Sequence, residues 1–68
     1  MIKNKIKTYR EKNGFSQEKT AILIGVSRNA LASIERGEAI PNLKIALKLS
    51  LLFNVSVEDL FYFDENKV

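Results

Sequence analysis

The sequence predicts a single all-α domain of five short helices. Apolar residues recur at helical spacing along successive stretches, and residues that start or stop helices bound each stretch. From these signals we expect helices over residues 4–13, 17–24, 28–36, 43–53 and 57–61, within one domain that spans residues 1–68. Residues suited to N-caps precede the last four of these helices: Ser16, Ser27, Asn42 and Ser56.

Residues 1–13 should be mostly helical, because Ile2, Ile6 and Tyr9 recur at helical spacing on one side, with lysines around the rest. Asn13-Gly14 ends this helix, because glycine after a helix adopts the left-handed conformation without a Cβ clash. Residues 1–3 could instead form a short extended segment. The alternative fold is therefore the same five helices with a short terminal β pair.

A tight turn at Gly25-Val26 joins the second and third predicted helices. Ala21 and Ile24 are the expected buried contacts of the second helix. Two short helices around a glycine-containing turn are typical of a helix-turn-helix motif, here over residues 17–36.

The third predicted helix has two different sides. On a helical wheel, Ala30, Leu31 and Ile34 fall together and would be packed. The opposite side holds small or hydrogen-bonding residues with a cation at each end: Arg28, Asn29, Ala32, Ser33 and Arg36. A helix in a DNA major groove needs such donors and acceptors, and small residues where the backbone comes close. The same pattern also fits an ordinary surface helix with a solvated polar face.

The fourth predicted helix is apolar almost all round, and Lys44 and Lys48 mark its one wet strip. Such a helix is buried on most sides, so we expect a central core helix that a second subunit could share. Three aromatic residues then follow in a row, and some of them should pack against the N-terminal segment or a second copy. The residues expected to pack in the core or in a dimer are Leu52, Phe53, Phe61, Tyr62 and Phe63.

Composition argues against several kinds of site. The chain has no cysteine and no histidine, which removes disulfides, thiolate metal sites and the usual general base. The acidic pairs Glu58-Asp59 and Asp64-Glu65 have no other ligand type beside them, and adjacent residues of a helix point to different faces. We therefore expect no catalytic site, no metal site and no cofactor.

The net charge of +3 is unevenly distributed along the chain. Residues 1–12 carry a net charge of +4, residues 13–37 of +1, and residues 38–68 of −2. The cation excess in the first half suits a surface that faces phosphates. No apolar run is long enough to span a membrane, and the N-terminus lacks the apolar core of a signal peptide. We expect a cytoplasmic protein with no membrane partner.

These features together resemble the Cro/C1-type (XRE family, lambda repressor-like) helix-turn-helix regulators, and their small stand-alone members in particular. The likeness extends from about Ile6 to Phe61. The residues that carry it are Ser16-Gln17-Glu18, Ala21, Gly25-Val26-Ser27-Arg28, Leu31, Ile34-Glu35-Arg36-Gly37, Pro41-Asn42-Leu43 and Asn54-Val55-Ser56-Val57-Glu58-Asp59-Leu60-Phe61.

The resemblance implies a five-helix domain that binds operator DNA as a two-fold dimer and represses transcription. It also implies an ion pair between Arg10 and Glu35 that ties the first helix to the end of the third. Gln17 would donate to a phosphate from the start of the second helix. The residues that the resemblance places against bases or phosphates are Gln17, Ser27, Arg28, Asn29, Ser33 and Arg36.

Thr20 departs from the family pattern, which usually has leucine at this position. Ile22 and Leu23 add apolar groups on a face that should be partly exposed. They either compensate for Thr20, meet a partner, or are scattered surface apolar residues. We favour the surface interpretation over the partner.

The leading hypothesis is a sequence-specific regulator that binds double-stranded DNA, acting as a repressor on a palindromic operator as a homodimer. The alternative is an antitoxin-like or other protein-interaction module that also binds DNA. A regulator that senses a small molecule ranks third, because the chain has no second domain for a pocket, and no small-molecule ligand is expected.

Overall fold

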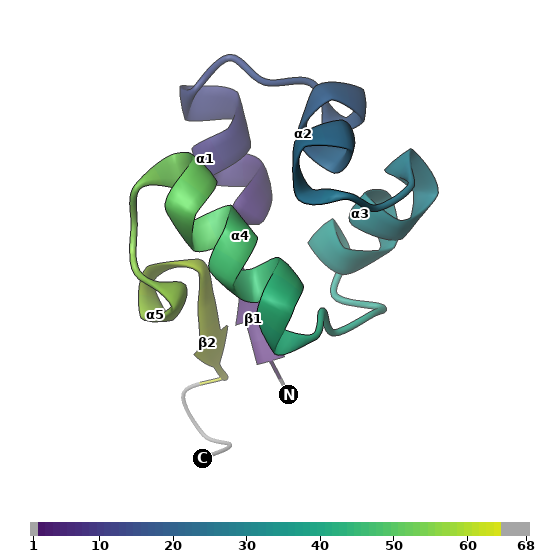
Figure 1. The fold of residues 1–68 in the computed structure, drawn as a ribbon. Helices are drawn as coiled ribbons and strands as arrows, with labels where there is room; N and C mark the ends of the chain where they lie inside the picture. Colours follow the sequence, from purple (N-terminus) through teal and green to yellow (C-terminus); the bar gives the residue numbers. More distant parts are fainter. Residues whose placement is uncertain (1, 65–68) are drawn as a thin grey trace.

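The computed structural model describes residues 2–64. Its elements follow in the order β1 (Ile2–Asn4), α1 (Ile6–Lys12), α2 (Gln17–Ile24), α3 (Arg28–Glu35), α4 (Leu43–Phe53), α5 (Val57–Leu60) and β2 (Phe61–Phe63). In Figure 1, α2 and α3 lie together on one side of the molecule, α4 crosses its middle, and the two strands lie at its lower end. The prediction of five helices is confirmed, and the short terminal β pair is present.

Side-chain caps set where four of the helices begin. Each cap accepts a hydrogen bond at 2.9–3.0 Å from the backbone N–H three residues later: Ser16, Ser27, Asn42 and Ser56. At α5 the carboxylate of Asp59 also accepts from the backbone N–H of Ser56, which completes a capping box. The helix boundaries after residue 16 therefore follow the predicted ones within a residue.

The first helix is shorter than predicted, because residues 2–4 form a strand. β1 pairs antiparallel with β2, with Ile2 opposite Phe63 and Asn4 opposite Phe61. The helix predicted over residues 4–13 is therefore wrong at its start, and the fifth helix ends at Leu60 rather than Phe61. Pairing residues 2–4 with residues 61–63 satisfies backbone groups that a frayed helical turn would leave to water. Met1 lies outside the described residues.

The core takes one or two side chains from each helix: Ile6, Ala21, Ile24, Leu31, Ile34, Leu49, Phe53 and Leu60. Phe53 is thus a core residue, and Leu52 and Phe61 pack partly buried against the core. Tyr62 and Phe63 remain 42% and 53% exposed, although their strand pairs with the N-terminal segment.

Helix α4 is central, but the expectation that it is buried on most sides is wrong within this chain. Ala46, Leu49 and Phe53 are buried, whereas Leu43, Leu47 and Leu51 are exposed. A domain of this size has too few helices to surround one of its own. Side chains on the remaining side of α4 therefore stay open to solvent.

Thr20 is fully buried in α2, while Ile22 and Leu23 are 73% and 50% exposed. The two apolar residues do not compensate for Thr20 inside the core, because they face solvent. Within residues 2–64, the Thr20 Oγ1 atom is buried and has no hydrogen-bond partner.

Candidate nucleic-acid interface

The inner faces of α2 and α3 hold the helix-turn-helix together. Ala21 and Ile24 of α2 join Leu31 and Ile34 of α3 in the core. Between the helices, Gly25 has a φ of 82°, a left-handed conformation that a Cβ would strain. Together the turn and the Ser27 cap set where α3 begins.

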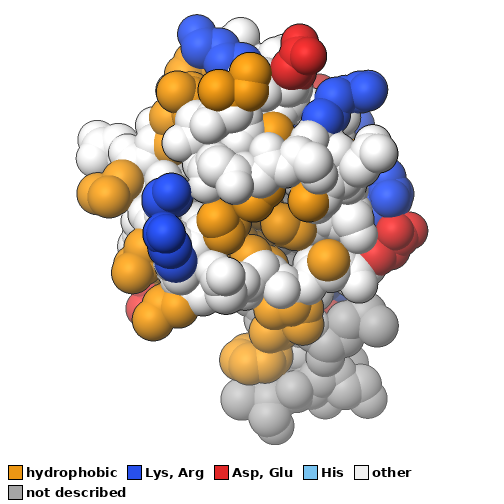
Figure 2. All heavy atoms as spheres, turned by 45° about the vertical axis from the view of Figure 1, so that its right-hand side comes forward, with side chains coloured by type: hydrophobic (Ala, Val, Ile, Leu, Met, Phe, Trp, Pro, Cys, Tyr) orange, Lys and Arg blue, Asp and Glu red, His pale blue; other side chains and the backbone are white. Residues whose placement is uncertain are grey.

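The outer face of α3 is polar. Arg28 and Asn29 are exposed on its first turn, and Ala32 and Ser33 farther along are half-buried. None of the side-chain hydrogen bonds among residues 2–64 involves Arg28 or Asn29, so their donors and acceptors are open to solvent. Figure 2 shows lysine and arginine side chains spread around this side of the molecule, with few acidic ones. The face can therefore offer hydrogen bonds to an anionic partner.

Behind this face, Arg10 and Glu35 form a buried ion pair. Arg10 Nε lies 2.7 Å from Glu35 Oε2, and the two side chains are 9% and 5% exposed. Arg10 Nη2 also donates to Glu35 Oε1 at 3.3 Å, and Nη1 donates to the Phe15 carbonyl at 2.8 Å. The guanidinium therefore joins α1, the loop before α2, and the last turn of α3. Such a pair is costly to break, because the remaining partner would be left charged and buried.

Gln17 belongs to the same network. Its Nε2 atom donates to Glu35 Oε1 at 3.0 Å, and its side chain is half-buried at the start of α2. The resemblance placed this amide against a phosphate. The structure shows that Glu35 holds one of its two N–H groups, so the other N–H remains for a ligand.

The two serines predicted to contact DNA differ in how accessible their hydroxyl groups are. The Ser27 hydroxyl accepts from the backbone N–H of Ala30 at 3.0 Å, so its own hydrogen is free to donate. Ser33 is half-buried, and its carbonyl accepts from the N–H of Glu38 at 3.0 Å. Ser27 is thus the more accessible donor at the start of α3.

Arg36, just after α3, is paired with Glu38. Its Nη2 atom lies 3.0 Å from Glu38 Oε1, and both side chains are more than half exposed. The guanidinium, by its hydrogen bond and its charge, lowers the pKa of the Glu38 carboxyl. Glu38 therefore competes with any phosphate for Arg36.

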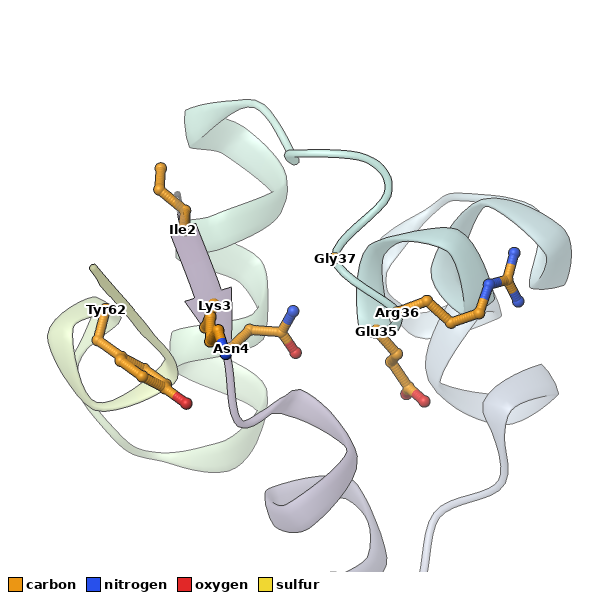
Figure 3. Close-up of a pocket in the computed structure, with 7 residues that line it drawn as sticks. All are labelled: Ile2, Lys3, Asn4, Glu35, Arg36, Gly37 and Tyr62. Carbon is orange, nitrogen blue, oxygen red and sulfur yellow. The ribbon is translucent and has the colours of Figure 1, made fainter. Parts of the chain in front are cut away.

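Asn4 is a contact that the sequence reasoning missed. Its Nδ2 atom donates to the Ile34 carbonyl at 2.9 Å, and its Oδ1 atom accepts from the Ile6 N–H at 3.2 Å. In Figure 3, Asn4 points from β1 toward the end of α3, beside a cavity of about 370 Å³ that Glu35 and Tyr62 also line. The side chain ties the strand pair to the third helix. No spacing pattern signals a contact between residues 30 positions apart.

No helix among residues 2–64 is long and apolar enough to cross a membrane. In the same part of the chain, no group of three or more acidic residues is placed to hold a metal ion.

Two side-chain-capped helices, joined by a glycine-containing turn and with a polar outer face on the second helix, define a helix-turn-helix domain. Residues 6–60 match the family model described as Helix-turn-helix (HTH_3), and the chain belongs to this family. The predicted resemblance to small Cro/C1-type regulators is confirmed.

Individual relatives are similar over most of the chain. An uncharacterized HTH-type transcriptional regulator of Bacillus subtilis, YgzD, is 42% identical over 64 residues, which cover 94% of this chain and 97% of the relative. The B. subtilis protein SinR, a master regulator for biofilm formation solved in complex with DNA, is 37% identical with a TM-score of 0.70, covering 78% of this chain and 86% of that chain. The restriction-modification controller protein C.AhdI of Aeromonas hydrophila is 30% identical with a TM-score of 0.72. The match covers 79% of this chain and 82% of that chain.

Proposed function

We propose that this protein is a transcriptional regulator that places α3 in the major groove of DNA, and that it acts as a repressor. The observation that carries the proposal is that Arg28 and Asn29 are exposed on the first turn of α3, and that their side chains make no hydrogen bond or ion pair among residues 2–64. Arginine can hydrogen-bond guanine through two atoms and asparagine can do so with adenine. The SinR structure with DNA supports this use of a related domain.

The rest of the α3 face is sparse, because Ala32 is small and Ser33 is half-buried. Few side chains remain for direct base reading. Much of the affinity should therefore come from phosphate contacts and from DNA shape. Around α3, we propose phosphate contacts for Ser27, Gln17 and Arg36. We propose that Ser27 and Ser33 can also approach base edges, because they lie at or beside the outer face of α3.

We further propose a homodimer on a palindromic operator. Two copies would place their α3 helices in successive major grooves, with half-sites about 34 Å apart on one side of the duplex. Selection of binding sites from random DNA with the purified protein tests specificity and symmetry together. A palindromic consensus is the expected result, and recovery of unrelated sequences would overturn the proposal.

Variants at the two base-reading residues test their role directly. Arg28→Ala and Asn29→Ala should each weaken operator binding by about tenfold or more while changing binding to random DNA much less. Lys7→Ala, which removes a cation from an exposed position on α1, is the matched control and should spare the difference between operator and random DNA. Equal losses on both DNAs would remove Arg28 and Asn29 from the specificity role.

Gln17→Ala should weaken operator and random DNA about equally, because a phosphate contact carries no sequence information. Gln17 is uncharged, so the dependence of affinity on salt should barely change. A loss confined to the operator would contradict a phosphate role for Gln17.

A second candidate function is an antitoxin-like module that binds a partner protein as well as DNA. The exposed Ile22 and Leu23 side chains on α2 favour it. Purification of the tagged chain from its native host separates the two candidates. A stoichiometric second protein that is lost in the Ile22→Glu variant would support the partner, whereas recovery of this chain alone would count against it.

A further inference from the structure

Three leucines on α4 form a row that no other part of residues 2–64 covers. Leu43, Leu47 and Leu51 are 70%, 49% and 82% exposed. They are spaced four residues apart, so they lie along one side of the helix, opposite the buried Leu49 and Phe53. We call this row the leucine stripe. Single exposed leucines are ordinary, but a row along one helix of a small domain indicates a contact surface.

The apolar surface continues past the first leucine of the stripe. Leu43 also lines a shallow groove of about 200 Å³, together with Ile40, Pro41, Val57 and Phe61. Ile40 is itself 67% exposed. The stripe therefore has a groove at the N-terminal end of α4 and a protruding side chain, Leu51, toward the other end.

We propose that the leucine stripe is a homodimer interface in which α4 packs antiparallel against α4 of a second copy. Leu47 is the midpoint of the stripe, so a two-fold axis beside it places Leu43 against Leu51 of the partner subunit. The inference rests on the proposed function and names the surface that joins the two DNA-binding units.

Self-pairing follows from the symmetry of the stripe. A two-fold interface needs a surface that is complementary to itself. A row of like side chains about a central one meets this condition when the second row runs in the opposite direction. The protruding Leu51 of one copy then faces the end of the partner that carries the groove. Each copy contributes four large apolar side chains that are about half exposed or more: Ile40, Leu43, Leu47 and Leu51.

The orientation also suits DNA binding. Lys48 lies beside the stripe, and its Nζ atom is 3.5 Å from the carbonyl of Ile24, at the end of α2. This flank of α4 therefore faces the helix-turn-helix. An antiparallel helix pair has its two-fold axis in the interface plane, perpendicular to the helices. That axis runs toward the flank that carries Lys48, so both helix-turn-helix units lie on the same side of the dimer, as binding to one side of a duplex requires.

Sedimentation of the purified chain, without DNA, tests the interface. The chain should be dimeric at micromolar concentrations, and Leu51→Glu should weaken dimerisation by about 100-fold or more, because both copies lose a buried leucine and gain a charge. Ile22→Glu is the matched control: Ile22 is 73% exposed and stands two residues before the end of α2, as Leu51 does in α4. It should leave the dimer intact, and circular dichroism should show both variants folded.

Cysteine cross-linking tests the antiparallel register, and the chain has no native cysteine to interfere. Leu47→Cys, next to the axis, should form a disulfide-linked dimer on mild oxidation. Leu43→Cys and Leu51→Cys should each cross-link poorly alone but should cross-link to one another when mixed. A wild-type chain that stays monomeric, or a dimer that Leu51→Glu leaves unchanged, would overturn the proposal.

These outcomes can be separated from failure of the proposed function. A monomer that still selects a single half-site from random DNA would remove the interface and keep DNA binding. A dimer that cross-links as described but ignores every duplex would keep the interface and remove DNA binding.

Discussion

Replacing Thr20 by valine should stabilise this protein. The Thr20 side chain is fully buried in α2, and its Oγ1 atom has no hydrogen-bond partner among residues 2–64. Burying a hydroxyl without a partner costs free energy, because its hydrogen bonds to water are lost and not replaced. Valine keeps the branched shape and removes the hydroxyl, and its intrinsic helix propensity is close to that of threonine.

The size of the effect follows from the burial. An unsatisfied buried polar group costs about 1–3 kcal/mol, so Thr20→Val should raise the free energy of unfolding by about 1–2 kcal/mol. For a domain of this length, each kcal/mol corresponds to about 4–8 °C in Tm. Urea and thermal unfolding followed by circular dichroism would measure both quantities. Protein concentration must be held equal, because the proposed dimerisation would add to apparent stability.

The other threonine of the chain supplies the control. Thr8 lies on α1 and is exposed, so Thr8→Val removes the same hydroxyl where water already satisfies it. That variant should change stability by no more than about 0.5 kcal/mol. Thr20→Val should leave DNA binding unchanged, because the side chain faces the core. If Thr20→Val instead destabilises the protein, the hydroxyl must find a partner in solution, such as the Ser16 carbonyl one turn earlier, and the reasoning is refuted.

Three further substitutions test other parts of the structure. Arg10→Met should lower the free energy of unfolding in urea by on the order of 3 kcal/mol, because it leaves Glu35 charged and buried. The double variant Arg10→Met/Glu35→Leu should recover most of the loss, and no recovery would mean that the charge of Glu35 is not the cause. Glu38→Gln should raise DNA affinity, measured by fluorescence anisotropy, by about two- to fivefold, because it frees Arg36 and removes a negative charge. An unchanged affinity would show that Arg36 does not contact DNA. Gly25→Ala should lower the free energy of unfolding by about 1 kcal/mol or more, because alanine is strained in the left-handed conformation of Gly25. An added Cβ would meet no clash, since its nearest atom would lie 3.6 Å away, in ordinary contact. An unchanged Tm would contradict this prediction.

Local chemistry made much of the fold predictable. A cap is read from one residue and the helix that follows it, so Ser16, Ser27, Asn42 and Ser56 could be assigned from the sequence and do cap their helices. The polar and apolar sides of α3 could also be predicted from the sequence, because a helix repeats its faces every few residues. The sequence could not do the same for α4. When nearly every position is apolar, periodicity cannot tell which side has a partner.

The Arg10–Glu35 pair was named only through the family resemblance, and its geometry came from the structure. The addition of Gln17 to that pair, and the Asn4 link to Ile34, had no sequence signal at all. Each depends on side chains that the chain brings together from distant positions. Whether Gln17 and the exposed residues of α3 contact DNA stays a prediction.

The sequence by itself determined the last four helices, the turn between α2 and α3, and the residues on the outer face of α3, because each depends on neighbours within a few positions. The sequence offered a terminal β pair only as an alternative, and tertiary structure decided that residues 2–4 pair with residues 61–63 as strands. Tertiary structure alone decided that Thr20 is buried without a hydrogen-bond partner among residues 2–64, and that no other described part of the chain covers Leu43, Leu47 and Leu51. These outcomes depend on which segments meet in space, and meeting in space is decided by how five short helices share one small core.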